Sequence, residues 1–288
     1  MPTELISPKT DAVSAPHTAW GPLPRCVRLI AITSVVLTCV GYCYRFHHYN
    51  LRAFSQLYFE WDFSERTADI AVVVMTAAMA LGIVAAPFRK LRYLIIPALA
   101  SLLFDIVCRI CYIGAIFPHL YLPNNALRLS PFVLLLGNFS TRTTVWILKI
   151  CIAATFTGHG LECLAAYPEF VDFVLATSRR VHLPMAESHA VNVVYLIGVI
   201  DIALSVIILL FNHPRIRWAL WYMMSWGAVT ACVRVVHYGP GAWHDVAIRS
   251  AHFLMVFALI AIIAANKKSA KKSPAAVARS DRPATAGI

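Results

Sequence analysis

Long apolar runs separated by short polar connections make up most of the chain. Seven of these runs approach or exceed the roughly twenty residues that a helix needs to cross the hydrocarbon core of a bilayer. They cover residues 29–46, 68–88, 93–117, 143–167, 191–212, 216–236 and 248–266. We therefore predict an all-α, polytopic integral membrane bundle of about seven transmembrane helices.

Two connections depart from this simple pattern. Residues 131–137 are apolar but too few to cross a bilayer, so we expect a re-entrant or peripheral segment there. Residues 52–63 combine charged side chains with Tyr58, Trp61 and Phe63, and such aromatic side chains favour the headgroup level of a membrane. We expect this second connection to lie at the membrane interface.

Composition supports a membrane protein and excludes an ordinary soluble domain. Hydrophobic residues make up 59% of the chain, charged residues only 14%, and the mean hydropathy is +0.68. A soluble domain carries roughly a quarter charged residues. The net charge of +11 comes from basic residues in tails and short loops, where anionic lipid headgroups attract them. We expect membrane lipid as a partner and no nucleic acid.

The basic residues also bear on orientation. With seven spans, the Lys and Arg residues of the loops and the tail favour a cytoplasmic C-terminus. The basic turn at residues 89–92 favours the opposite orientation, and an eighth crossing near Pro131 would change this balance.

Four segments follow from these patterns. Residues 1–26 form a cytoplasmic or peripheral tail, and residues 27–141 form the N-terminal membrane helices with their interfacial loop. Residues 142–266 form a second membrane unit. Residues 267–288 are rich in Ala, Ser, Pro and Lys, a composition that predicts a disordered basic tail.

Charged side chains inside the apolar runs need partners or a function, because each costs about 2.5 to 3.5 kcal/mol at mid-membrane on insertion scales. Asp105 and Arg109 are four residues apart, on one face of a helix, and we expect an ion pair between them. Such a pair has a purely structural interpretation as well as a functional one. Asp201 is expected either to pair with Arg234 or Lys149 or to belong to a site.

His159 and Glu162 are the strongest candidates for chemistry. They lie three residues apart on one helical face, with Gly158 and Gly160 allowing another helix or a ligand to approach closely. An imidazole beside a carboxylate can relay protons, although a simple helix contact would explain the pair too. Arg249 and His252 repeat the same spacing in the last run.

Cys108 and Cys111 have the spacing of a redox dithiol. They fall in the middle of a predicted helix rather than at its start, where a thiolate would be stabilised, so inert cysteines are the competing interpretation. The sequence has no zinc-type Cys and His cluster, no P-loop and no Gly-rich dinucleotide turn, and we expect no metal site.

Short motifs follow one another from Arg142 onward. A span that begins at Arg142 ends in Gly158-His-Gly, and the later motifs are Ile197-Gly-Val-Ile-Asp201, Trp226-Gly-Ala-Val-Thr-Ala-Cys-Val-Arg234 and Trp243-His-Asp-Val-Ala-Ile-Arg249-Ser-Ala-His252. In order and spacing they resemble the DoxX-like family of small bacterial membrane proteins, which are four-helix units. The resemblance covers about half of the chain. It implies such a unit over residues 142–266 and a location in the bacterial inner (plasma) membrane.

This sequence departs from the DoxX-like pattern at two places. Residues 1–141 add about three spans, and the last helix has Arg249 and His252 where the pattern has an acid, an arginine and an amide. Members resembling this chain are linked to quinone-coupled sulfur oxidation or to membrane-associated thiol redox complexes, and most have no assigned activity. The resemblance therefore implies a redox or quinone role, with quinone as a candidate cofactor and other membrane or peripheral redox subunits as candidate partners.

The leading functional hypothesis is a redox-associated membrane protein that binds a quinone-like or small anionic ligand in an intramembrane polar cluster. His159 would exchange a proton with the ligand and Glu162 would orient it. Asp201, Arg234, Arg249 and His252 would complete the binding site. Two alternatives stay open: a proton-coupled transporter of a small solute, and a non-catalytic subunit of a larger membrane complex.

Overall fold

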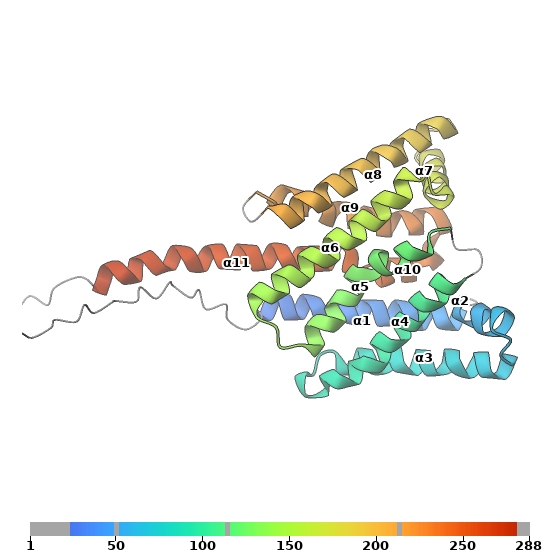
Figure 1. Cartoon of the computed structure of the whole chain (residues 1–288), viewed down its shortest axis with the longest axis horizontal. Coiled ribbons are helices and arrows are strands. Elements are labelled where there is room, and N and C mark those ends of the chain that lie inside the picture. The colour runs from blue at the N-terminus through green and yellow to red at the C-terminus, as the bar shows by residue number, and fades with distance from the viewer. Residues whose placement is uncertain (1–23, 49–51, 113–115, 212–214, 281–288) are drawn as a thin grey trace, which may run out of the picture.

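Helices form every regular element that the structure describes. The computed structural model describes residues 24–48, 52–112, 116–211 and 215–280, and no strand occurs in these ranges (Figure 1). Six helical stretches are long and apolar enough to span a membrane: α1 (Arg25–His48), α3 (Glu65–Ala85), η2 with α4 (Arg89–Cys111), α6 (Thr141–Leu164), α8 (Glu187–Leu210) and α9 (Arg217–Tyr238).

The last span is bent. Residues Pro240–Ile248, which comprise η4 (Pro240–Ala242) and α10 (Trp243–Ile248), meet the following helix at an angle of 43°. That helix, α11, begins at Ala251. If the bent pair counts as one span, the bundle has seven, so the predicted all-α polytopic membrane architecture is confirmed.

Shorter helices complete the chain at the ends of the spans. They are α2 (Arg52–Ser55), η1 (Gln56–Glu60), η3 (Pro118–Leu120) and α7 (Pro168–Arg180). Within the third span, η2 (Arg89–Ile95) continues into α4 (Ile96–Cys111), and α5 (Tyr121–Leu136) is a separate helix between the third and fourth spans. The aromatic connection around η1 exposes Phe59, Trp61 and Phe63. This exposure fits the interfacial position that we expect for it.

Serine side chains mark where two of the spans begin. The Ser64 hydroxyl accepts a hydrogen bond of 3.2 Å from the Thr67 backbone N–H at the start of α3. The Ser140 hydroxyl accepts one of 3.1 Å from the Thr143 backbone N–H at the start of α6. Each bond satisfies a backbone donor that has no partner within the first helical turn.

Helix α5 lies inside the bundle, so the expectation of a re-entrant or peripheral segment at residues 131–137 is wrong. The helix packs against α1, α4, α6 and α11 and buries Leu127 and Phe132 completely. Its polar residues lowered the apparent hydropathy of this region, yet Asn124 and Arg128 face other helices rather than lipid. Burial against protein removes the need for a fully apolar surface.

The direction of α5 adds an eighth pass through the bundle. Tyr121, at the start of α5, lines a cavity together with Arg45 and Arg109, which lie near the ends of α1 and α4. Asn138, just after the end of α5, accepts a hydrogen bond of 2.9 Å from Arg92 at the opposite end of the bundle. Helix α5 therefore runs from one end of the bundle to the other.

Close contacts at glycines bring α6 against its neighbours. A Cβ atom on Gly198 of α8 would lie 2.7 Å from the backbone oxygen of Gly160, so these two helices touch along their backbones. A Cβ atom on Gly158 would collide with the side-chain oxygen of Asn124 on α5. The close approach expected at these two glycines is therefore an approach of helices.

The C-terminal helix extends beyond its apolar part. Helix α11 covers Ala251–Ser280, so it continues from the last apolar run into the Ala- and Lys-rich residues 267–280. Ala and Lys are strong helix formers, which accounts for the continuation. Residues 281–288 and the N-terminal residues 1–23 lie outside the described parts of the chain.

Candidate functional site

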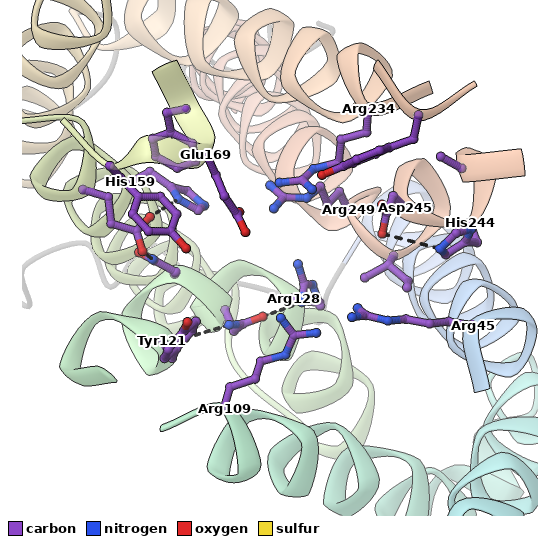
Figure 2. A pocket seen from close by; sticks show the side chains of 18 residues that line it. Arg45, Arg109, Tyr121, Arg128, His159, Glu169, Arg234, His244, Asp245 and Arg249 are labelled. Atoms are coloured by element: carbon purple, nitrogen blue, oxygen red, sulfur yellow. Dashed lines mark hydrogen bonds and ion pairs between the residues drawn. The ribbon is translucent and has the colours of Figure 1, made fainter. Parts of the chain in front are cut away.

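A cavity of about 600 Å³ opens at the end of the bundle where α1, α4, α6 and α9 terminate. Its most conspicuous feature is a set of five arginines whose guanidinium groups point toward one space (Figure 2). These arginines are Arg45, Arg109, Arg128, Arg234 and Arg249. Three acids, Glu162, Glu169 and Asp245, also line it. We call this space the basic cavity.

Five different elements supply the arginines. Arg45 comes from the last turn of α1, Arg109 from the last turn of α4, and Arg128 from the middle of α5. Arg234 lies near the end of α9, and Arg249 follows α10 at the bend before α11. No short sequence motif links these positions, so only helix packing brings them together.

Asp105 forms an ion pair with one of the five arginines, Arg109. The Arg109 Nε donates to Asp105 Oδ2 across 3.1 Å, which places the expected ion pair in the structure. The Tyr42 hydroxyl donates a further hydrogen bond of 3.2 Å to the same oxygen. The pair lies beside the basic cavity, because Arg109 lines it and Asp105 is buried behind it.

The other four arginines have no carboxylate within 4 Å in the described ranges. Arg128 donates to the side-chain oxygen of Asn125, and its other described partner is the Tyr42 hydroxyl at 3.4 Å. Arg234 lies over the ring of Phe173, with its guanidinium carbon 4.9 Å from the ring centroid. Four of the five guanidinium groups therefore lack an ion-pair partner within 4 Å among the described residues, although three acids line the same cavity.

The three acids of the basic cavity do not supply the missing partners. Glu162 is engaged by Asn124 and His159, and Asp245 has its closest described cation in His244, at 3.8 Å. Glu169 lies in the first turn of α7 and is exposed. In Figure 2 its carboxylate points into the space between the arginines without a marked ion pair.

His159, Glu162 and Asn124 form a connected group at one wall of the basic cavity. The His159 Nδ1 lies 3.1 Å from Glu162 Oε2, and Asn124 Nδ2 donates to Glu162 Oε1 across 2.7 Å. An ionised carboxylate only accepts hydrogen bonds, so this arrangement places the proton of a neutral imidazole on Nδ1. The His159 Nε2 atom is buried and has no hydrogen-bond partner among the described residues. No hydrogen bond to a described residue therefore occupies the second ring nitrogen of His159.

His252 lies close to His159 but belongs to a second hollow. The two imidazole centroids are 5.9 Å apart, and His252 Nδ1 lies 3.1 Å from the backbone oxygen of Arg249. Because that carbonyl only accepts, His252 carries its proton on Nδ1. Its Nε2 atom is buried without a described partner.

Asp201 does not pair with Lys149 or Arg234, so that expectation is wrong. Within the described ranges, no cation lies within 4 Å of the Asp201 carboxylate, and its Oδ1 has no hydrogen-bond partner. Lys149 instead donates to the backbone oxygens of Leu209 and Phe211, at 3.5 and 3.0 Å. The backbone carbonyls at the C-terminal end of α8 therefore supply the hydrogen-bond partners of the Lys149 ammonium group.

The second hollow is an apolar groove of about 430 Å³ between α7, α8 and α9. Its surface is almost entirely hydrophobic, with Asp201 and His252 among its few polar lining residues. Four residues line both the groove and the basic cavity: His159, Phe170, Arg234 and Arg249. The two spaces are therefore neighbours.

All six residues that the sequence suggested for catalysis and ligand binding line one or both of these spaces. Glu162 lines the basic cavity, Asp201 and His252 line the apolar groove, and the remaining three line both. The pair Cys108 and Cys111 lines neither. Both are free thiols, Cys108 buried within α4 and Cys111 exposed at its end. The described residues contain no group of three or more His, Cys, Asp or Glu side chains that could hold a metal ion.

Sequence reasoning missed two of the arginines and their neighbours. Arg45 ends the first apolar run, and Arg128 shares a helical face with Asn124 and Asn125. The spacing of these three polar residues at positions i, i+1 and i+4 was a usable signal, because it marks one face of a helix. The classification of this stretch as peripheral obscured it.

Comparisons with protein-family models, with curated proteins and with solved structures find no match to this chain. The resemblance to the DoxX-like family therefore stays a prediction from the motifs, and the argument for function depends on the geometry of the two spaces.

Proposed function

We propose that this integral membrane protein binds an anionic ligand in the basic cavity and exchanges a proton with it through His159. The observation that carries the proposal is the convergence of five arginines from five elements, only one of which has a carboxylate partner among the described residues. An uncompensated charge in a membrane protein is expensive, and an anionic ligand would supply the missing compensation.

Arginine suits this role better than any other cation. Its planar guanidinium presents paired N–H groups that match the oxygens of a phosphate or a carboxylate. Arg128, Arg234 and Arg249 leave most of these donors without described protein partners. The chemistry favours an oxygen-rich anion, and a neutral quinone would leave the positive charge uncompensated.

His159 supports a proton exchange at the same place. Glu162 and Asn124 hold its ring, so that the Nε2 lone pair faces away from this group. A positioned imidazole whose far nitrogen is free is the usual arrangement of a general base. In this proposal Glu162 orients His159, and the arginines hold the ligand's negative charge.

The path of α5 supports a cytoplasmic C-terminus. With this additional pass, both described ends of the chain lie at the end of the bundle opposite the basic cavity. The loops and helix ends there are rich in basic residues: Arg25, Arg28, Arg89, Lys90, Arg92, Arg142, Arg215 and Arg217. By the positive-inside rule, these residues support a cytoplasmic location for that end and a location of the basic cavity on the opposite side of the membrane. The membrane in this proposal is the bacterial inner membrane.

Two exposed cysteines at opposite ends test this orientation. Cys26 begins α1, and Cys111 ends α4 near the basic cavity. In single-cysteine variants, a membrane-impermeant maleimide added to intact cells should label Cys111, and it should label Cys26 only after permeabilisation. Labelling of Cys26 in intact cells would contradict the orientation.

Calorimetric titration with inorganic phosphate and with methyl phosphate tests the anion site. Arg249→Gln should weaken binding about tenfold or more, because a hydrogen bond from a charged group contributes roughly 1.5–3 kcal/mol. Arg92→Gln is the matched control, since Arg92 bonds Asn138 and Tyr93 at the opposite end of the bundle. Equal binding by wild type and Arg249→Gln, or no binding to wild type, would refute the proposal.

Titration in buffers with different heats of ionisation tests the proton exchange. If His159 takes up a proton as the anion binds, the observed heat changes from buffer to buffer, and His159→Gln removes that dependence. His189→Gln is the control, because His189 is exposed at the start of α8 and lines neither space. Buffer dependence that survives in His159→Gln would assign the proton to another group.

A further inference from the structure

We infer that the ligand is an amphipathic lipid anion, with its headgroup in the basic cavity and its hydrocarbon chain in the apolar groove. The inference deepens the proposed function and rests on it. It starts from the fact that the two spaces are neighbours of opposite character: arginines surround one, and hydrophobic side chains line the other almost completely.

The boundary between the spaces is where a headgroup would join a chain. Arg234 and Arg249 line both spaces, so each can contact an anion on one side and the start of a chain on the other. The ring of Phe173, which lies under the Arg234 guanidinium, lines the groove. One ligand with a charged end and an apolar end would satisfy both sides of this boundary.

The depth of each space agrees with the position of a lipid. The basic cavity lies where four spans end, which is the level of lipid headgroups. From Arg234 the groove follows α9 back to Trp226, a distance of about 12 Å at 1.5 Å per residue. The groove also follows α8 in the same direction, from Val193 to Asp201. A chain in the groove would point from the headgroup level toward the middle of the bilayer, as lipid chains do.

The groove is also accessible from the lipid side. Val193 of α8 and Val229 of α9 line it and keep 38% and 48% of their surface exposed, so its rim faces outward between these two helices. Asp201 is the one acid along the groove, and at 2% exposure it adds little to the surface that a chain would meet. A lipid can therefore enter sideways from the membrane.

The sizes of both spaces suit such a ligand. The volumes of about 600 and 430 Å³ each fall in the range of roughly 300 to 1,000 Å³ that is typical of small-molecule sites. A free phosphate ion would occupy only part of the basic cavity and leave the groove unused. A free phosphate ion and a lipid headgroup share the same oxygen-rich anionic chemistry. The groove selects the ligand that also carries a hydrocarbon chain.

Short alkyl phosphates test the inference in solution. Hexyl phosphate should bind about tenfold more tightly than methyl phosphate, because each buried methylene adds to the affinity. Val229→Trp should fill the groove and remove this advantage, while methyl phosphate binding stays unchanged. Val236→Trp is the matched control: it is also a partly exposed valine on α9, but it does not line the groove, and it should keep the advantage.

The outcomes separate this inference from the proposed function. If the two phosphates bind equally and Arg249→Gln weakens both, the anion site stands and the lipid inference falls. If neither binds to wild type, both fall. If hexanol competes as well as hexyl phosphate and Arg249→Gln changes nothing, the groove binds a neutral molecule and both fall again.

Native mass spectrometry of protein released from its own membranes tests the natural occupant. The inference predicts one acidic lipid bound per chain, lost in Val229→Trp and kept in Val236→Trp. A lipid-free dimer that Val229→Trp dissociates would show that a second copy covers the groove, and it would overturn the inference. A bound phosphate ion without a lipid would overturn it as well.

Discussion

The chain holds buried cations in two opposite ways, and Lys149 and Arg249 show the contrast. Lys149 is 2% exposed and donates to two backbone oxygens at the end of α8, with the ring of Trp146 4.8 Å from its ammonium nitrogen. Arg249 lines two neighbouring spaces, and the described residues place no acid within 4 Å of its side chain.

In the proposed function, this difference separates a structural charge from a charge that binds a ligand. The carbonyls at a helix C-terminus carry partial negative charge and lack partners within the helix, so a lysine placed there satisfies them and itself. The protein itself therefore supplies the hydrogen-bond partners of the Lys149 ammonium group. In the proposed function, a bound anion completes the surroundings of Arg249.

Lys149→Met should produce the largest change in stability. It removes the donor from the Leu209 and Phe211 carbonyls, and the free energy of unfolding should fall by roughly 1.5–3 kcal/mol, the typical value of a charged hydrogen bond. Reversible unfolding in mixed micelles measures this loss, and phosphate affinity should not change. The exposed Lys90→Met is the control, with an expected change within about 0.5 kcal/mol. A loss of phosphate binding in Lys149→Met would remove the contrast with Arg249.

Gly158→Ala should affect stability and binding together. The added methyl group displaces the Asn124 side chain, which holds Glu162, and overpacking of this kind costs about 1–3 kcal/mol. Phosphate affinity and the buffer-dependent heat should both fall, because His159 loses its fixed partner. Thr157→Ala, one residue earlier on α6, should change neither. Unchanged binding in Gly158→Ala would show that the Asn124 contact does not support the site.

Arg249→Gln should give the smallest change in stability. The direction of that change distinguishes Arg249 from Lys149. Because no described acid lies within 4 Å of this guanidinium, its loss should leave the unliganded free energy of unfolding unchanged or raise it by up to about 1 kcal/mol. Reversible unfolding in mixed micelles measures this change, as it does for Lys149→Met. A large loss of stability without ligand would mean that Arg249 has a structural role like that of Lys149.

The sequence predicted the spans and the local pairs well. Seven apolar runs correspond to six spanning helices and a bent pair, because membrane insertion depends on hydropathy over roughly twenty consecutive residues. Asp105 lies beside Arg109, and His159 lies beside Glu162, as their spacing predicts. Helix geometry fixes such neighbours without reference to the rest of the chain.

Contacts between distant segments were harder to predict. The prediction that Asp201 pairs with Lys149 or Arg234 combined opposite charges without knowledge of their positions. Lys149 contacts the end of α8 instead. Residues 131–137, which the structure places at the end of α5, were expected to be re-entrant or peripheral, with an eighth crossing near Pro131 as the alternative. Hydropathy reports what faces lipid, and this helix faces protein.

By itself the amino-acid sequence determined that the chain is a helical membrane protein and that its buried charges need compensation. Only the tertiary structure decided which of these charges have a partner within 4 Å among the described residues and which line the basic cavity without one. The physical reason is distance: the arginines of the basic cavity come from segments as far apart as Arg45 and Arg249, and their convergence depends on how whole helices pack.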